Sequence, residues 1–115
     1  MKDDRLYVDH ILECIRDVVE FTREGKDVFF SDKKTQQAVI RTLQTLAEST
    51  QRLSDSLKLR HAEVNWIAIA GFRNVVVHDY LGLDLEQVWE IVVDDIPELK
   101  RQIETIRGEL DDDRR

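Results

Sequence analysis

Hydrophobic residues recur at intervals of three and four along most of the chain, which is the period of an amphipathic helix. In the first segment this spacing predicts a helix over residues 4–23, ended by Gly25. The linker after it contains the apolar run Val28-Phe29-Phe30, which we expect to enter the core. The apolar stripe of this helix consists of Leu6, Val8, Ile11, Leu12, Ile15, Val18 and Val19.

A second stripe predicts a longer helix that begins at Ser31 or Asp32, both good N-cap residues, and continues to about Leu57. A shorter and less regular stretch over residues 58–65 follows it. The stripe of the second helix consists of Val39, Leu43, Leu46, Leu53 and Leu57.

The third predicted helix covers residues 65–78, with Asn65 as its N-cap. Apolar residues lie on nearly all sides of it, so we expect it to be central and buried. Gly71 in its middle costs about 1 kcal/mol relative to alanine. A glycine tolerated there suggests that another helix, or the backbone of a ligand, approaches closely.

The last part of the chain predicts two further helical segments after a turn over residues 80–83. Asp84 and Gln87 match a capping box, and Pro97 fits the first turn of a final helix. Residues 111–115 are expected to form a frayed tail. The whole pattern predicts one all-α domain over residues 1–110, a compact bundle of four or five helices.

The composition is that of a globular helical protein, and it argues against a membrane-spanning, secreted or metal-binding protein. Of 115 residues, 42% are hydrophobic and 36% charged, with only four glycines and one proline. No apolar run is long enough to span a bilayer and no signal-peptide core is present, so we expect a cytoplasmic protein without membrane contact. The single Cys14 and the three histidines lack the spacing of a metal site, and no metal or other cofactor is expected.

The net charge of −7 argues against nonspecific binding of nucleic acid by the chain as a whole. The charge is unevenly distributed, however. Residues 33–61 contain six basic and two acidic residues, a net of +4, so a local basic face could still hold RNA. An ordinary solvated helix face is the alternative interpretation of the same residues. The charged residues of this segment are Lys33, Lys34, Arg41, Glu48, Arg52, Asp55, Lys58 and Arg60.

Three polar residues of the third helix, Arg73, Asn74 and His78, are not explained by packing. Arginine is almost never fully buried without a partner, and one candidate partner across a helix interface is Glu48. Asn74 and His78 are four residues apart and share a face. Arg73 and His78 are about 140° apart around the axis, so they flank one groove. Tyr80 returns close to the Arg73 side if the helix continues that far.

The segment from Arg73 to Tyr80 resembles the signature of HEPN proteins, in which an arginine, a polar residue and a short spacer precede a histidine. Its spacing, Arg-X4-His-X-Tyr, is similar to that of the HepT toxins, which are paired with MNT-type nucleotidyltransferase antitoxins. The resemblance covers about residues 4–107. It includes Trp66 ahead of the motif, and Trp89 followed by Asp95-Ile96-Pro97-Glu98-Leu99.

This resemblance implies a fold and an activity. HEPN toxins are helical bundles that form dimers, in which two motifs face each other across one cleft and cleave RNA without a metal ion. HepT toxins are neutralised when the antitoxin attaches AMP to the tyrosine of the motif. Carried over, Arg73 and His78 are catalytic, Asn74 is a supporting polar group and Tyr80 is the AMPylation site. The implied partners are RNA, either tRNA or mRNA, the antitoxin of a type VII pair, and a second copy of the chain.

The residue types fit this chemistry. Histidine titrates near neutral pH and can act as acid or base, while the guanidinium of arginine presents a fork of donors to phosphate oxygens. Each motif has one histidine, whereas the reaction needs both an acid and a base, so a dimer could supply the second His78. Two alternatives remain. One is a HEPN dimer with little nuclease activity that acts as a binding partner or modification substrate of a nucleotidyltransferase, and the other is a purely structural dimerisation module.

Overall fold

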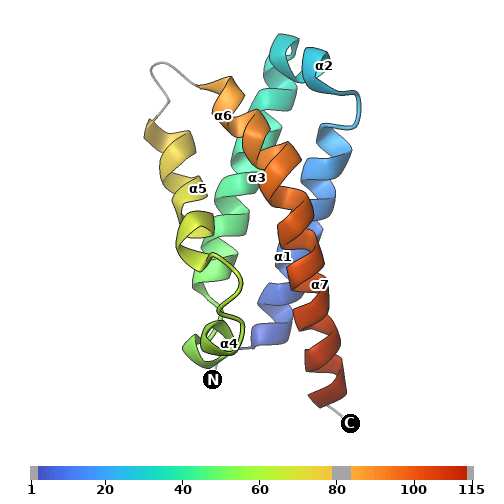
Figure 1. Ribbon diagram of the computed structural model, residues 1–115. Helices are drawn as coiled ribbons and strands as arrows, with labels where there is room; N and C mark the ends of the chain where they lie inside the picture. The colour runs from blue at the N-terminus through green and yellow to red at the C-terminus, as the bar shows by residue number, and fades with distance from the viewer. Residues whose placement is uncertain (1–2, 79–83, 114–115) are drawn as a thin grey trace.

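The structure of the protein is a computed structural model that describes residues 3–78 and 84–113, with side chains described for residues 3–73 and 84–112. Over these residues all of the regular structure is helical, as the hydrophobic pattern predicts. Four long helices form the bundle (Figure 1): α1 (Asp4–Phe21), α3 (Lys33–Gln51), α5 (Trp66–His78) and α7 (Ile96–Asp113). Three short helices lie between them: α2 (Lys26–Ser31), α4 (Asp55–Arg60) and α6 (Leu85–Glu90).

The four long helices pack in the order α5, α3, α1, α7, since α3 contacts both α5 and α1, and α1 also contacts α7. Figure 1 shows α5 at the edge of the bundle beside α3. The core lies between the helices and is almost entirely aliphatic. Its largest fully buried side chains include Ile11, Ile15, Phe29, Leu43, Leu46, Leu53, Leu57, Ile96, Ile103 and Ile106.

The linker after α1 is a short helix, which the sequence did not predict. α1 ends at Phe21, two residues before the predicted end, and Gly25 adopts a φ of 97° before α2 begins. Only glycine adopts such a backbone conformation without strain. α2 carries Phe29 fully into the core, where its ring lies 5.3 Å from that of Trp89. The prediction that this apolar run enters the core is therefore confirmed for Phe29.

The second predicted helix is divided in two, because the helical conformation is interrupted between Gln51 and Asp55. Ser54 caps α4, its hydroxyl accepting a hydrogen bond from the backbone N–H of Leu57 at 3.2 Å. The carboxylate of Asp4 also holds this residue, accepting from the backbone N–H of Ser54 at 2.8 Å and from its hydroxyl at 2.6 Å. The prediction of one continuous helix to Leu57 is wrong because Ser54 bonds to a residue on α1 that is distant in sequence.

The prediction that residues 65–78 form a helix capped by Asn65 is confirmed, since the Asn65 side chain accepts from the N–H of Ala68 at 3.0 Å. The prediction that this helix is buried all round is wrong for its described side chains. Ile69 and Phe72 face the core, but Ile67 is 86% exposed and Arg73 is exposed. α5 lies at the edge of the bundle, so one of its sides faces solvent.

The C-terminal part is one unbroken helical run from Leu85 to Asp113, because the π-helical segment η2 (Ile91–Asp95) joins α6 to α7. Asp84 caps α6, as the capping box predicts, by accepting from the N–H of Gln87 at 3.2 Å. α7 extends three residues into the predicted frayed tail, ending at Asp113. None of the helices among the described residues is both long enough and apolar enough to cross a membrane.

Candidate active site

The backbone of α5 places the motif residues on one helix. Arg73, Asn74 and His78 all lie within Trp66–His78. Along an α-helix, five residues correspond to a rise of about 7.5 Å and a rotation of about 140°, so the helical backbone separates Arg73 and His78 by that amount, and the groove between them stays a prediction. The side chains of Asn74 and His78, and the whole of Tyr80, lie outside the described residues. Arg73 is the motif residue whose side chain the structure describes.

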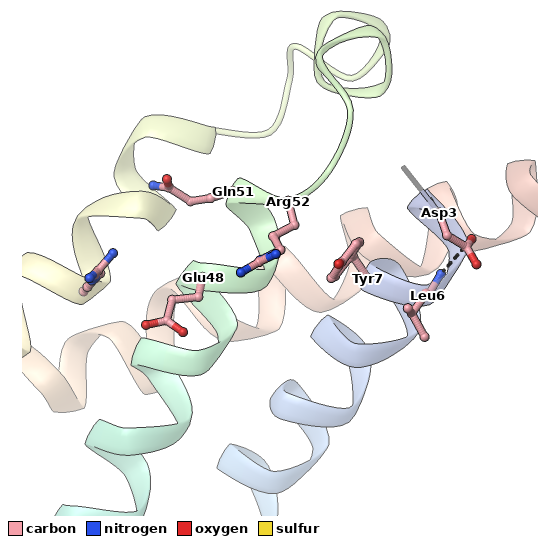
Figure 2. A pocket seen from close by; sticks show the side chains of 7 residues that line it. Asp3, Leu6, Tyr7, Glu48, Gln51 and Arg52 are labelled. Atoms are coloured by element: carbon pink, nitrogen blue, oxygen red, sulfur yellow. Dashed lines mark hydrogen bonds between the residues drawn. The ribbon is translucent and has the colours of Figure 1, made fainter. Parts of the chain in front are cut away.

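The side chain of Arg73 opens onto a polar hollow of about 930 Å³ (Figure 2). We call it the Arg73 hollow. Its walls come from three helices: the start of α1, the end of α3 and the middle of α5. The residues that line it are Asp3, Leu6, Tyr7, Glu48, Gln51, Arg52 and Arg73.

The ion pair considered for Arg73 and Glu48 is not formed. Arg73 is exposed rather than buried, and no ion pair joins it to any described residue. Glu48 is exposed as well, and faces the same hollow from α3. The expectation of a buried pair is wrong because α5 packs at the edge of the bundle, where a guanidinium group remains hydrated without a partner. Among the described residues, no carboxylate therefore neutralises Arg73.

Four polar side chains face the Arg73 hollow without an internal partner. The hydroxyl of Tyr7, the carboxylate of Glu48, the amide of Gln51 and the guanidinium of Arg52 make no hydrogen bond or ion pair with any other residue that the structure describes. Sequence reasoning did not find Tyr7 or Gln51, because each resembles an ordinary helix residue in its own segment. Arg52 could have been singled out, since it belongs to the predicted basic segment.

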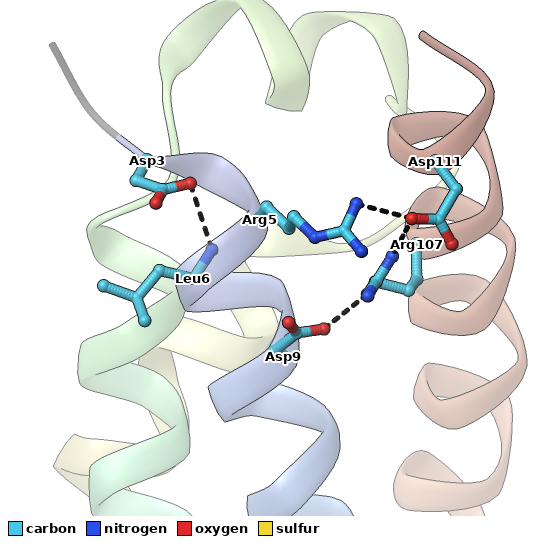
Figure 3. A network of polar contacts seen from close by, with 6 residues as sticks. All are labelled: Asp3, Arg5, Leu6, Asp9, Arg107 and Asp111. Atoms are coloured by element: carbon cyan, nitrogen blue, oxygen red, sulfur yellow. Dashed lines mark hydrogen bonds and ion pairs between the residues drawn. The ribbon is translucent and has the colours of Figure 1, made fainter. Parts of the chain in front are cut away.

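The α1 wall of the hollow is held firmly from two sides. The hydrogen bonds between Asp4 and Ser54 tie it to the junction of α3 and α4. On the opposite side Arg5 donates to Asp111 of α7, and Arg107 donates to both Asp9 and Asp111 (Figure 3). The guanidinium of Arg107, and secondly that of Arg5, lowers the pKa of the Asp111 carboxyl.

Three cations of the predicted basic segment lie on one line along α3. Lys34, Arg41 and Arg52 are separated by seven and eleven residues, which places them within about 20° of one another around the helix axis. All three are exposed, and none forms an ion pair with a described residue. The line ends at the Arg73 hollow, where Arg52 forms part of the wall.

A second surface of α5 is open to solvent. Ile67 and Gly71 are four residues apart and share a face, and nothing described in this chain lies within 4 Å of a Cβ placed on Gly71. The close approach predicted for Gly71 is therefore not made by the described part of this chain.

A family model for HepT-like ribonucleases matches residues 11–106, which is most of the chain. The chain belongs to the HepT-like ribonuclease family. This HepT-like chain is 39% identical over 102 residues to a Thermococcus cleftensis protein named "Probable ribonuclease HepT", covering 88% of this chain and 93% of that protein. It is 34% identical to the Methanocaldococcus jannaschii "Putative RNase MJ0127", covering 96% of this chain and 92% of the relative.

A further relative is a longer protein. It is the Methanocaldococcus jannaschii "Gamma-glutamylcyclotransferase and putative RNase MJ0434", which is 37% identical to the HepT-like chain over 111 residues. The aligned region covers 96% of the HepT-like chain but only 50% of that relative. No solved structure matches the chain significantly. Family membership supports a ribonuclease function and suggests RNA as the substrate class.

Proposed function

We propose that this HepT-like protein is a ribonuclease in which Arg73 and His78 cleave RNA, without a metal ion, at a cleft between two copies of the chain. The observation that carries the proposal is the position of Arg73. It is exposed, opens onto a polar hollow and pairs with no described carboxylate, on the same helix that carries Asn74 and His78. An arginine buried for structural reasons would have an internal partner, whereas Arg73 is exposed at the hollow.

The proposed reaction uses the 2′-hydroxyl of the RNA itself. Its oxygen attacks the adjacent phosphorus and loses its proton to one His78, while the bond from phosphorus to the 5′ oxygen breaks. The leaving oxygen takes a proton from a second acid, which gives a 2′,3′-cyclic phosphate and a 5′-hydroxyl. Arg73 donates to the phosphate oxygens as charge develops on them. Asn74 supplies a supporting hydrogen-bonding group on the His78 face of the helix.

A homodimer provides the second acid, since each motif contains one histidine. The open face of α5 supports this arrangement, because Ile67 is 86% exposed and no described neighbour lies within 4 Å of a Cβ placed on Gly71. Ile67, Gly71 and His78 recur at spacings of four and seven residues, so they lie along one side of the helix. A second copy packed against this side would bury Ile67 and bring the two His78 residues close together.

The cations of α3 support RNA as the substrate despite the net charge of −7. Lys34, Arg41 and Arg52 are about 10 Å and 16 Å apart along the helix, at 1.5 Å per residue. Phosphates of a single strand that follows this line would reach the Arg73 hollow. A local row of unpaired cations attracts a polyanion even on an acidic protein.

Regulation by a partner is part of the same proposal. We place the chain in a type VII toxin–antitoxin pair, in which an MNT-type nucleotidyltransferase transfers AMP to the hydroxyl of Tyr80. Tyr80 follows His78 by two residues, so an added AMP would block the cleft and repel RNA phosphate. Incubation with ATP and the antitoxin should increase the intact mass by one AMP, and Tyr80→Phe should abolish the increase.

The decisive experiment is cleavage of tRNA and of a long mRNA by purified protein in EDTA. The variants are His78→Ala, Arg73→Ala and, as a matched control, Arg16→Ala, which removes an exposed arginine of α1 far along the chain from the motif. We expect at least a 100-fold loss of rate in the first two, since general acid–base catalysis contributes about 10²–10⁴-fold. The control should cleave like the wild type.

Two results would overturn the proposal. Equal cleavage by wild type and His78→Ala would assign the activity to a contaminant or to other residues. Absence of cleavage by a folded wild type whose mass shows no AMP would favour the alternative of a non-catalytic partner of a nucleotidyltransferase. For the shared cleft, heterodimers of wild type and His78→Ala should retain much less than half of the wild-type activity.

A further inference from the structure

We propose that the Arg73 hollow is a nucleobase subsite, which holds one base of the RNA beside the scissile phosphate and prefers a base with an exocyclic amino group over uracil. The preferred bases are therefore adenine, guanine and cytosine. This inference rests on the proposed ribonuclease function and adds a substrate preference to it. It makes the hollow the element of the protein that selects where RNA is cut.

The size and position of the hollow fit a nucleotide. Its volume of about 930 Å³ lies at the upper end of the range usual for sites that bind small molecules. Arg73 forms part of its wall, so a phosphate bound at that guanidinium places the attached nucleoside against the walls made by α1 and α3. Because the hollow opens to solvent, a base on a continuous strand can enter without threading an end.

One wall offers a surface for stacking. Tyr7 is half-buried and packs against the core, so its ring position is fixed. Figure 2 shows Arg52 approaching the same space from the end of α3, with its guanidinium directed towards Glu48. Unstacked RNA bases are typically held on aromatic rings and on guanidinium planes. Tyr7 and Arg52 provide one of each.

The other polar groups favour donors on the base edge. Glu48 and Gln51 face the hollow and have no described partner, and an ionised carboxylate only accepts hydrogen bonds. Adenine, guanine and cytosine present an exocyclic amino group that can donate to it, as cytosine does to glutamate in DNA recognition. Uracil has no exocyclic amino group, and its single N3–H donor lies between two carbonyl oxygens that would face the carboxylate unfavourably.

The charges of the lining also favour a nucleotide over a simple anion. Two arginines, Arg52 and Arg73, are balanced by Asp3 and Glu48. A free phosphate would be attracted by the two arginines and repelled by the two carboxylates. A nucleotide presents a phosphate to Arg73 and a neutral base with amino donors to Glu48, so it satisfies both signs at once.

The test maps cleavage sites on an RNA pool of random sequence, for the wild type and for variants of the hollow. We expect the wild type to disfavour uracil at one position next to the cut. Glu48→Gln should admit uracil, because an amide can donate to a carbonyl. Tyr7→Leu should reduce cleavage about tenfold, in line with the loss of one stacked base, and Tyr7→Phe should restore it.

The control is Gln37→Ala, beside Gln51→Ala. Both glutamines are exposed on α3, but Gln37 lies fourteen residues from Gln51 and outside the hollow. Only Gln51→Ala should change the base preference. A wild type that cleaves all four bases equally, or a preference unchanged in Glu48→Gln and Gln51→Ala, would overturn the subsite while leaving the ribonuclease function intact.

A binding experiment separates the two proposals if the wild type proves inactive. Titration of isotope-labelled protein with the four nucleoside 5′-monophosphates, followed by NMR, should shift the resonances of Tyr7 and Gln51. AMP, GMP and CMP should bind more tightly than UMP, and inorganic phosphate alone should not reproduce the shifts. Equal binding of UMP, or shifts confined to residues outside the hollow, would contradict the subsite whatever the outcome of the cleavage assay.

Discussion

The hydrogen bonds between Asp4 and Ser54 give the most direct test of how the site is held. The carboxylate of Asp4 accepts from the backbone N–H of Ser54 at 2.8 Å and from its hydroxyl at 2.6 Å. Hydrogen bonds to a charged group contribute about 1.5–3 kcal/mol each to stability when they are well formed. This pair is only partly buried, so each of the two bonds is expected to contribute less than that range, about 1 kcal/mol. We expect Asp4→Ala to lower the free energy of unfolding by about 2 kcal/mol.

Urea denaturation followed by circular dichroism measures this change, as a shift of the midpoint without a change of slope. The melting temperature should fall by about 8 °C, at about 4 °C per kcal/mol for a chain of this length. The matched control is Asp17→Ala, which removes an exposed carboxylate of the same helix and should change stability by less than about 0.5 kcal/mol. If Asp4→Ala were no less stable than this control, the explanation of the break between α3 and α4 would be refuted.

Three further predictions concern titration and charge. Burial, followed by the charges of neighbouring acids, raises the pKa of the Cys14 thiol to about 11, so native protein at pH 8 should resist iodoacetamide and unfolded protein should react. The pKa of Asp111 is lowered, mainly by Arg107, so its stabilisation is complete above the unfolded pKa of about 3.9 and is lost as pH falls through the lowered value. The difference in urea midpoint between wild type and Asp111→Asn should therefore be smaller at pH 3 than at pH 7. Lys34→Ala and Arg41→Ala should each reduce the salt slope of single-strand binding by about 0.7 in a filter-binding assay.

The outcomes that contradict these predictions are distinct. Rapid alkylation of the native thiol would show that α1 opens locally. A difference between wild type and Asp111→Asn that is as large at pH 3 as at pH 7 would mean that the ion pairs do not account for the effect of the substitution. An unchanged salt slope would show that RNA does not bind along the row of α3 cations. The Arg73 hollow would then be tested separately.

Several features of the fold are present in local sequence because they depend on local physics. The spacing of apolar residues identifies the buried stripe of α1, and Asn65 and Asp84 act as caps because their side chains bond to backbone N–H groups three residues away. The motif of α5 is likewise a matter of spacing along one helix. It could be read without knowledge of the neighbouring helices.

Other features depend on residues that are far apart in sequence. Ser54 caps α4 through a local hydrogen bond to Leu57, but it is also held by Asp4 of α1, and no pattern within residues 31–57 contains that second contact. Arg73 is exposed because α5 packs on α3 at the edge of the bundle, although its own sequence is that of a buried helix. Tyr7 and Gln51 belong to the Arg73 hollow only because the start of α1 lies beside the end of α3.

The sequence by itself therefore determined that the chain is helical and which helix carries the Arg-X4-His-X-Tyr motif, since periodicity, caps and motif spacing act within a few turns. The tertiary structure decided which faces remain free. Contacts between helices leave Ile67 and Arg73 exposed. The same contacts bring together the side chains that line one hollow, which include Tyr7, Glu48, Gln51 and Arg52. The physical reason is that burial and convergence depend on neighbours distant in sequence, whereas helix formation depends on neighbours along the chain.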